Sequence, residues 1–210
     1  MAKISFKPGN MLYPLPVVMV SVADKQGNSD IITVAWAGTI CTNPPMVSIS
    51  VRPERFSHHM LMETGEFVIN LTTKELVYAT DYCGVKSGRD VDKWKEMNLT
   101  PVMGKVVNVP CIEESPVNIE CKVVKVDKLG SHDMFTAEVV AVQVDDAYMD
   151  ENKSFHLSKA NPIVYSHGEY YLLGEKLGKF GYSIQKKSQS KKDRITHKKA
   201  GKMSKSGKNT

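Results

Sequence analysis

The sequence predicts a mainly β protein, a mostly antiparallel barrel or sandwich with a few short inserted helices. Six or seven runs of apolar and β-branched residues are separated by turn residues, which is typical of strands. Only short helical patterns interrupt these runs. No regular alternation of strand and helix patterns occurs, and this disfavours a doubly wound parallel sheet.

The first strands are indicated by two apolar, β-rich runs at residues 15–23 and 31–41. Turn-forming residues at 24–28 separate them, so the pair predicts a hairpin. After a break at two prolines, residues 46–51 alternate between apolar side chains and serine. This alternation predicts a strand with one buried and one polar face.

Two short helices are expected next. Residues 55–64 have an apolar side and are followed by Gly65, which predicts a helix that ends there. Residues 67–71 predict a short strand and residues 74–82 a second helix. Residues 84–93 form a polar segment with two glycines, and we expect a loop there.

The second half of the sequence has the longest strand patterns. Residues 117–126 and 134–144 each carry apolar side chains at every second position. The turn residues at 129–133 join them into a predicted hairpin. Residues 163–173 predict a final strand that is interrupted at His167-Gly168.

The charge of the chain is unevenly distributed. Residues 185–210 hold ten Lys or Arg and one Asp, whereas residues 1–184 hold 18 basic and 22 acidic residues. We therefore expect a domain at residues 1–184 and a basic, disordered tail at 185–210. The tail alone supports salt-dependent nucleic-acid binding, so no specific nucleic-acid partner is expected.

Other classes of protein are also disfavoured. No apolar run approaches the ~18–20 residues of a membrane span, and no secretory signal is visible, so no membrane partner is expected. The four cysteines, at 41, 83, 111 and 121, have no Cys-x-x-Cys spacing, and we expect no metal site. Reduced, mostly buried thiols in a cytoplasmic protein are the expectation.

Two clusters in the first half have residue types that suit a ligand. Residues 30–38 place Trp36 among small side chains, either as a flat surface for an aromatic ring or as a core tryptophan. Residues 50–58 place two arginines and a serine where a strand passes into a helix. That junction suits an anion such as phosphate, or is an ordinary helix start with solvated arginines.

Two further clusters are equally ambiguous. The basic, glycine-containing segment 82–93 either closes over a phosphate or is a solvated loop without P-loop spacing. Residues 130–135 place His132 in a tight turn, where it faces a pocket or lies at the surface. No Ser or Cys nucleophile has an evident partner there, so hydrolysis is not supported. Together the four clusters suit a planar phosphorylated cofactor better than a metal or a nucleic acid.

An ordered set of segments resembles the flavin reductase-like family, and within it the flavoredoxins, over residues 8–184. The segments are residues 32–38, Pro44-Pro45, 50–53, 64–70, 83–88 with 92–93, 130–135, 162–165 and 171–174. The resemblance implies an FMN-binding split β-barrel, and a homodimer with FMN near the subunit interface.

The resemblance also implies roles for individual residues. Trp36 would lie beside the isoalloxazine, Tyr165 would border it, and His132 would act as the catalytic residue by hydrogen bonding. Ser57 and Lys93 would hold the phosphate, together with Arg52 or Arg55. The full set of candidate cofactor-binding residues is Asp30, Thr33, Trp36, Ser50, Arg52, Arg55, Ser57, Lys93, His132 and Tyr165.

Three positions depart from the family pattern. Asp30 stands where the family often has Asn, and we expect an acid there to repel reduced, anionic flavin and to lower its potential. Ser57 replaces a common Thr but keeps the hydroxyl. Tyr165 replaces an aromatic residue that is often Phe, which adds a hydroxyl.

The implied function is an FMN-dependent oxidoreductase that passes electrons from NAD(P)H to an acceptor, either a small molecule or a redox protein. The cofactor would carry the redox chemistry and the protein would orient it. The alternative is a flavoredoxin-type electron carrier that receives electrons from a protein donor. Direct oxidation of NAD(P)H discriminates between the two.

Overall fold

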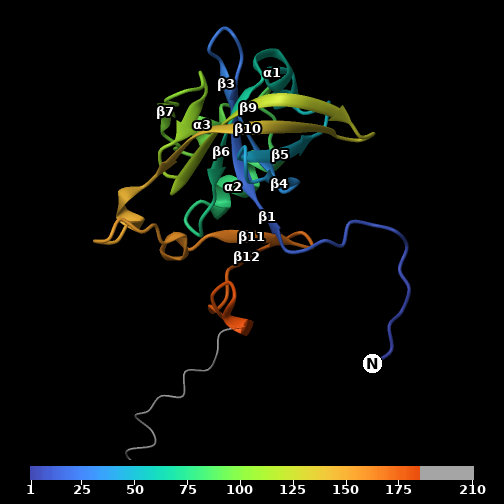
Figure 1. Cartoon of the computed structure of the whole chain (residues 1–210). Helices are drawn as coiled ribbons and strands as arrows, with labels where there is room; N and C mark the ends of the chain where they lie inside the picture. Colours follow the sequence, from blue (N-terminus) through green and yellow to red (C-terminus); the bar gives the residue numbers. More distant parts are fainter. Residues whose placement is uncertain (185–210) are drawn as a thin grey trace, which may run out of the picture. The chain divides into compact units, whose positions relative to one another are not determined.

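One antiparallel seven-stranded sheet forms the body of the protein in the computed structural model, which describes residues 1–184 (Figure 1). Its spatial order is β3-β2-β6-β9-β10-β5-β4. The strands are β2 (Val18–Ala23), β3 (Ser29–Val34), β4 (Ala37–Cys41), β5 (Met46–Val51), β6 (Glu66–Leu71), β9 (Val117–Lys128) and β10 (Asp133–Val144).

Two small sheets accompany this one. The first contains β1 (Leu15–Pro16), β11 (Ile163–Ser166) and β12 (Glu169–Leu172), in the order β1-β11-β12. The second pairs β7 (Pro101–Met103) with β8 (Pro110–Ile112). All strand pairs in the described residues are antiparallel, so the predicted mainly β, antiparallel fold class is confirmed.

Three short α-helices are inserted between the strands: α1 (Phe56–Thr64), α2 (Val77–Val85) and α3 (Lys93–Glu96). Single 3-10 turns, η1 (Asp146–Tyr148), η2 (Leu157–Ala160) and η3 (Tyr182–Ile184), complete the described elements. Helix α1 ends as expected at Gly65, whose φ of 64° is the left-handed conformation that glycine adopts most readily.

The core lies inside the curved main sheet. Fully buried side chains from four strands meet there, namely Val20, Ile49, Phe67 and Phe135. Strand β5 alternates as predicted, because Val47, Ile49 and Val51 are buried and the two serines between them are partly exposed. The two edge strands of the sheet, β3 and β4, are consecutive in the chain, and β3 also contacts β5. The sheet thereby closes toward a barrel.

The predicted strand at residues 31–41 is two strands. β3 pairs with β2, and β4 pairs with β5 on the opposite edge of the sheet. Ala35 and Trp36 make the crossing, and the Ser50 backbone N–H donates to the Trp36 carbonyl at 2.8 Å. Periodicity could not reveal this break, because apolar residues continue through it.

The second predicted helix begins and ends later than expected. It spans Val77–Val85 rather than residues 74–82, so Gly84 lies in a helix and not in the predicted loop. A Cβ at Gly84 would lie 3.2 Å from the Cβ of Thr33. Glycine therefore eases the close approach of α2 to β3 here and does not act as a turn residue.

Three further differences concern the strand count. The twelve strands within residues 1–184 exceed the predicted six or seven, mainly because several of them have only two to five residues. The predicted strand at 163–173 is the hairpin β11–β12, whose turn residues His167 and Gly168 have φ of 51° and 85°. Strands β7 and β8 were not predicted, since each has three residues and includes a proline.

Residues 1–173 form one compact unit, and the described residues 174–184 lie outside it. The predicted basic tail, residues 185–210, lies outside the described residues. Within residues 1–184 no helix combines the length and the apolar character that crossing a membrane requires.

Candidate functional site

Two adjoining cavities lie where β3, β5, α1 and α2 approach one another. We name the first, of about 260 Å³, the ring cavity, and the second, of about 230 Å³, the basic cavity. Ile32, Arg52 and Arg55 line both, so the cavities share a wall. The polar and aromatic residues of the ring cavity are Thr33, Trp36, Ser50, Asp81, His132, Tyr165 and Tyr170. Those of the basic cavity alone are Asp30, Glu54, Phe56, Ser57, Lys86, Ser87, Arg89 and Lys93.

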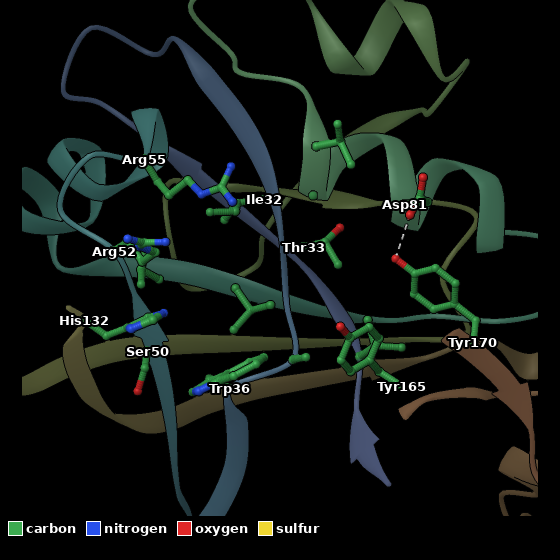
Figure 2. A pocket seen from close by; sticks show the side chains of 16 residues that line it. Ile32, Thr33, Trp36, Ser50, Arg52, Arg55, Asp81, His132, Tyr165 and Tyr170 are labelled. Atoms are coloured by element: carbon green, nitrogen blue, oxygen red, sulfur yellow. Dashed lines mark hydrogen bonds between the residues drawn. The ribbon is translucent and has the colours of Figure 1, made fainter. Parts of the chain in front are cut away.

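Two flat side chains form one side of the ring cavity. Trp36 follows β3, and His132 precedes β10; their rings are parallel within 4°, with centroids 6.1 Å apart (Figure 2). Trp36 is 39% exposed, so it is not the core tryptophan that its sequence pattern also allowed. A planar aromatic ligand could lie along this surface.

Two tyrosines and one acid form the opposite side (Figure 2). Tyr165 of β11 and Tyr170 of β12 face each other across their hairpin, with ring centroids 5.9 Å apart. The Tyr170 hydroxyl donates to Asp81 Oδ1 at 3.0 Å. Burial, followed by this hydrogen bond, raises the pKa of Tyr170 to about 12. Tyr170 therefore remains a neutral phenol across the physiological pH range.

The basic cavity has an excess of positive charge at its rim. Arg52 is paired with Glu54 at 2.7 Å. Arg55, Lys86 and Arg89 form no ion pair with any acidic side chain in residues 1–184. These three exposed cations, on a helix N-terminus and the loop after α2, favour an anionic ligand.

A buried polar cluster lies beneath this rim. Asp30, Ser57 and Lys93 are 2%, 1% and 3% exposed. Lys93 Nζ lies 3.1 Å from Asp30 Oδ1, and Ser57 Oγ donates to Asp30 Oδ2 at 2.5 Å. Lys93 also donates to the carbonyl of Ile31 at 2.5 Å. The three side chains come from β3, α1 and α3, and so only the fold brings them together.

All ten candidate residues from the sequence line one cavity or the other. Sequence reasoning missed Asp81 and Tyr170. The signal for Tyr170 was the turn at His167-Gly168, because a hairpin there places position 170 opposite Tyr165. Asp81 offered no comparable local signal, since its partner Tyr170 is 89 residues away.

Asp30 does not lie in the cavity where the expected repulsion of reduced flavin would require it. It lines the basic cavity and not the ring cavity, and Lys93 is paired with its carboxylate. A direct repulsion between Asp30 and reduced flavin rings therefore has no geometric support here. Ser57 keeps its hydroxyl, but that hydroxyl is directed to Asp30.

The cysteines supply no reactive group to this site. All four are free; Cys83, Cys111 and Cys121 are buried, and Cys41 is partly exposed. Cys83 lines the basic cavity, yet burial raises the pKa of its thiol to about 12, so the thiolate is disfavoured. In residues 1–184 no group of three or more His, Cys, Asp or Glu side chains is arranged to hold a metal.

Comparison with known proteins places this site in a family. Residues 10–174 match the family model for the flavin reductase like domain. The chain belongs to the flavin reductase-like family. The match includes both cavities and all ten candidate residues.

Solved structures agree with this assignment to the flavin reductase-like family. Flavoredoxin of Desulfovibrio vulgaris (Miyazaki F) is 30% identical with a TM-score of 0.82, over 88% of this chain and 100% of that one. Flavoredoxin from Methanosarcina acetivorans is 26% identical with a TM-score of 0.79, over the same shares. An uncharacterised protein of Archaeoglobus fulgidus is 32% identical over 66% of this chain and 77% of its own length.

Proposed function

We propose that this member of the flavin reductase-like family binds FMN and passes electrons from NAD(P)H through the flavin to an acceptor. The observation that carries the proposal is the pair of adjoining cavities, one with flat aromatic walls and one with a basic rim. A flavin mononucleotide has the same two parts, a planar ring system and a phosphate.

The residues of the ring cavity fit an isoalloxazine. Trp36 and His132 offer parallel flat surfaces, and Ile32 and Val34 supply a buried apolar wall. Thr33 cannot donate to the ring, because its hydroxyl already donates to the Thr80 carbonyl at 2.5 Å. Its role would be to fix β3 against α2.

The basic cavity fits the phosphate. Arg55 lines both cavities, so a ligand that spans them passes its guanidinium. Lys86 and Arg89 add two cations from the loop after α2. The two cavities together fall within the ~300–1,000 Å³ usual for ligand sites.

When bound, FMN supplies the redox chemistry, and the chain's residues bind, orient and shield it. His132 would donate a hydrogen bond to the flavin from its half-buried ring. The Tyr165 hydroxyl would border the ring on the opposite side. The neutral Tyr170 phenol, held by Asp81, would keep this wall in place without adding charge.

A second function, electron carriage from a protein donor, is favoured by one observation. The two structures described above, at 30% and 26% identity, both carry the name flavoredoxin. In that case the flavin would be reduced by a redox protein rather than by NAD(P)H. The same cavities would serve both functions.

We also propose that the chain forms a homodimer. The segment before β1 exposes four large apolar side chains, Ile4, Phe6, Met11 and Leu12, and exposed apolar side chains of this kind suit an interface. Light scattering coupled to size-exclusion chromatography tests this. A mass of one chain, with or without FMN, would contradict it.

An anaerobic absorbance titration tests the proposed function. The purified protein, supplied with FMN, is expected to show bound flavin bands that bleach promptly on addition of NADH or NADPH. Bands that persist until dithionite is added would favour the electron carrier. A chain that takes up no flavin would contradict both functions.

A further inference from the structure

We propose that Asp30 competes with the ligand phosphate for the same hydrogen-bond donors. Its carboxylate accepts the hydrogen bonds of Ser57 and Lys93, so the phosphate is bound only by the exposed cations at the rim of the basic cavity. This inference rests on the proposed function and deepens it. It predicts that FMN is held weakly through its phosphate, and that one substitution at Asp30 strengthens the hold.

The donors of Lys93 are fully used inside the protein. An ammonium group has three N–H donors. The Nζ atom of Lys93 lies 3.1 Å from Asp30 Oδ1, and it donates to Asp30 Oδ2 (3.4 Å), to the Ile31 carbonyl (2.5 Å) and to the Cys83 carbonyl (3.5 Å). Since Lys93 is only 3% exposed, water does not compete for these bonds. No donor remains to reach a phosphate in the basic cavity.

The hydroxyl of Ser57 is committed in the same way. It has a single O–H, which donates to Asp30 Oδ2 at 2.5 Å. Its remaining lone pairs are acceptors and offer nothing to a phosphate dianion. Both side chains that suit a phosphate by position are therefore directed toward an internal carboxylate.

Asp30 also contributes an unfavourable charge to the cavity. Its carboxylate lines the basic cavity under the loop after α2, where a Cβ at Gly88 would lie 2.5 Å from Asp30 Oδ1. The carboxylate and Lys93 cancel each other's charge at short range. The net attraction for an anion then comes from Arg55, Lys86 and Arg89, all exposed and screened by water.

The substitution Asp30→Asn changes this balance without changing the side-chain size. An amide carries no charge and adds two N–H donors. Lys93 keeps its two backbone carbonyl acceptors, and its positive charge is no longer cancelled. We expect the phosphate to gain the attraction of Lys93 and a donor from Ser57 or Asn at position 30.

The experiment compares FMN with riboflavin, which lacks the phosphate, by fluorescence titration of the full-length protein. The dissociation constant for riboflavin divided by that for FMN isolates the contribution of the phosphate. In Asp30→Asn we expect this ratio to rise about tenfold or more, because a charge-assisted hydrogen bond contributes ~1.5–3 kcal/mol. The dissociation constant for riboflavin should change less than about threefold.

Asp133→Asn is the matched control. Asp133 is also a buried, paired carboxylate, at 2.9 Å from His58 Nε2, but it lines neither cavity. Its neutralisation should leave the ratio unchanged. Circular dichroism and thermal melts of each variant show whether it remains folded.

Ser57→Ala in the otherwise native chain gives an independent test that does not depend on the folding of Asp30→Asn. Since the Ser57 proton is held by Asp30, the ratio should stay within about twofold of the native value. A tenfold fall, or an unchanged ratio in folded Asp30→Asn, would overturn the inference. Failure of the native chain to bind either flavin would instead refute the proposed function, and this inference with it.

Discussion

Trp36 shows at the scale of one residue how the ring cavity is built. The chain crosses between the edges of the main sheet at this position, so the side chain leaves the core and remains 39% exposed. Its ring is parallel to that of His132, which belongs to the turn between β9 and β10. The flat surface therefore depends on two positions far apart in the sequence.

Replacing Trp36 by Ala should weaken flavin binding about tenfold, because an aromatic contact contributes ~0.5–1.5 kcal/mol beyond its buried area. Flavin fluorescence quenching measures this, with riboflavin and FMN affected equally. Trp36→Phe is the control and should retain most of the affinity. Equal losses in the two variants would show that the ring surface is not the binding determinant.

At the scale of elements, one buried glutamate fixes a loop to a strand. Glu120 of β9 is fully buried and accepts the backbone N–H groups of Lys105, Val106 and Val107 at 2.9, 2.7 and 3.0 Å. The Gln143 side chain donates a fourth bond at 3.1 Å. Burial acts to raise the pKa of Glu120, but these donors together lower it below its ordinary value of 4.5.

A carboxyl group whose pKa is lowered on folding stabilises the protein above its unfolded pKa, and that stabilisation is lost as the pH falls through the folded pKa. We therefore expect Glu120→Gln to lose about 1–3 kcal/mol of unfolding free energy at pH 7. The difference from the native chain should begin to shrink below pH 4.5, where Glu120 of the unfolded chain takes up a proton, and should vanish as the pH falls through the lower pKa of the folded protein. Urea unfolding at pH 7 and pH 3.5 measures both, and a constant difference would contradict the assignment.

The loop after α2 depends on a second close contact. A Cβ at Gly88 would lie 2.5 Å from Asp30 Oδ1 and 2.6 Å from Phe56 Cδ1, which is far inside normal contact distances. Gly88→Ala should therefore displace the loop that carries Lys86 and Arg89, and weaken FMN binding more than riboflavin binding. Gly38→Ala is the control, because a Cβ there meets nothing within 4 Å. Fluorescence titration of both variants with FMN and with riboflavin measures these changes in affinity.

At the scale of the whole molecule, the charge is divided between two parts of the chain. Residues 1–184 carry a net −4 and residues 185–210 a net +9, from the counts of acidic and basic side chains. The cavities lie entirely within the acidic part. The basic residues beyond 184 are therefore not required to explain a flavin site.

A chain that ends at Ile184 should keep its flavin content and its dissociation constant for FMN within about twofold, because no cavity residue is removed. The same truncation should move the protein from cation-exchange to anion-exchange resin at pH 7, since its net charge changes sign. Flavin content and elution are the two measurements. Loss of flavin would show that the basic segment takes part in binding.

The sequence by itself determined the antiparallel strands and the helix that ends at Gly65, and its resemblance to the flavin reductase-like family supplied the ten candidate residues, all of which line a cavity. The strands and the helix follow from local rules, namely side-chain alternation and turn residues. The strand break at Ala35 and Trp36 and the short strands β7 and β8 did not follow, because nothing within their own segments distinguishes them.

Only the tertiary structure decided what the cavity residues do to one another. Asp30 and Lys93 are 63 residues apart in the chain, and Tyr170 and Asp81 are 89 apart. A local pattern identifies each as polar, but it does not say which donor meets which acceptor. That pairing is set by burial, since side chains shut off from water must satisfy their hydrogen bonds with whatever the fold places beside them.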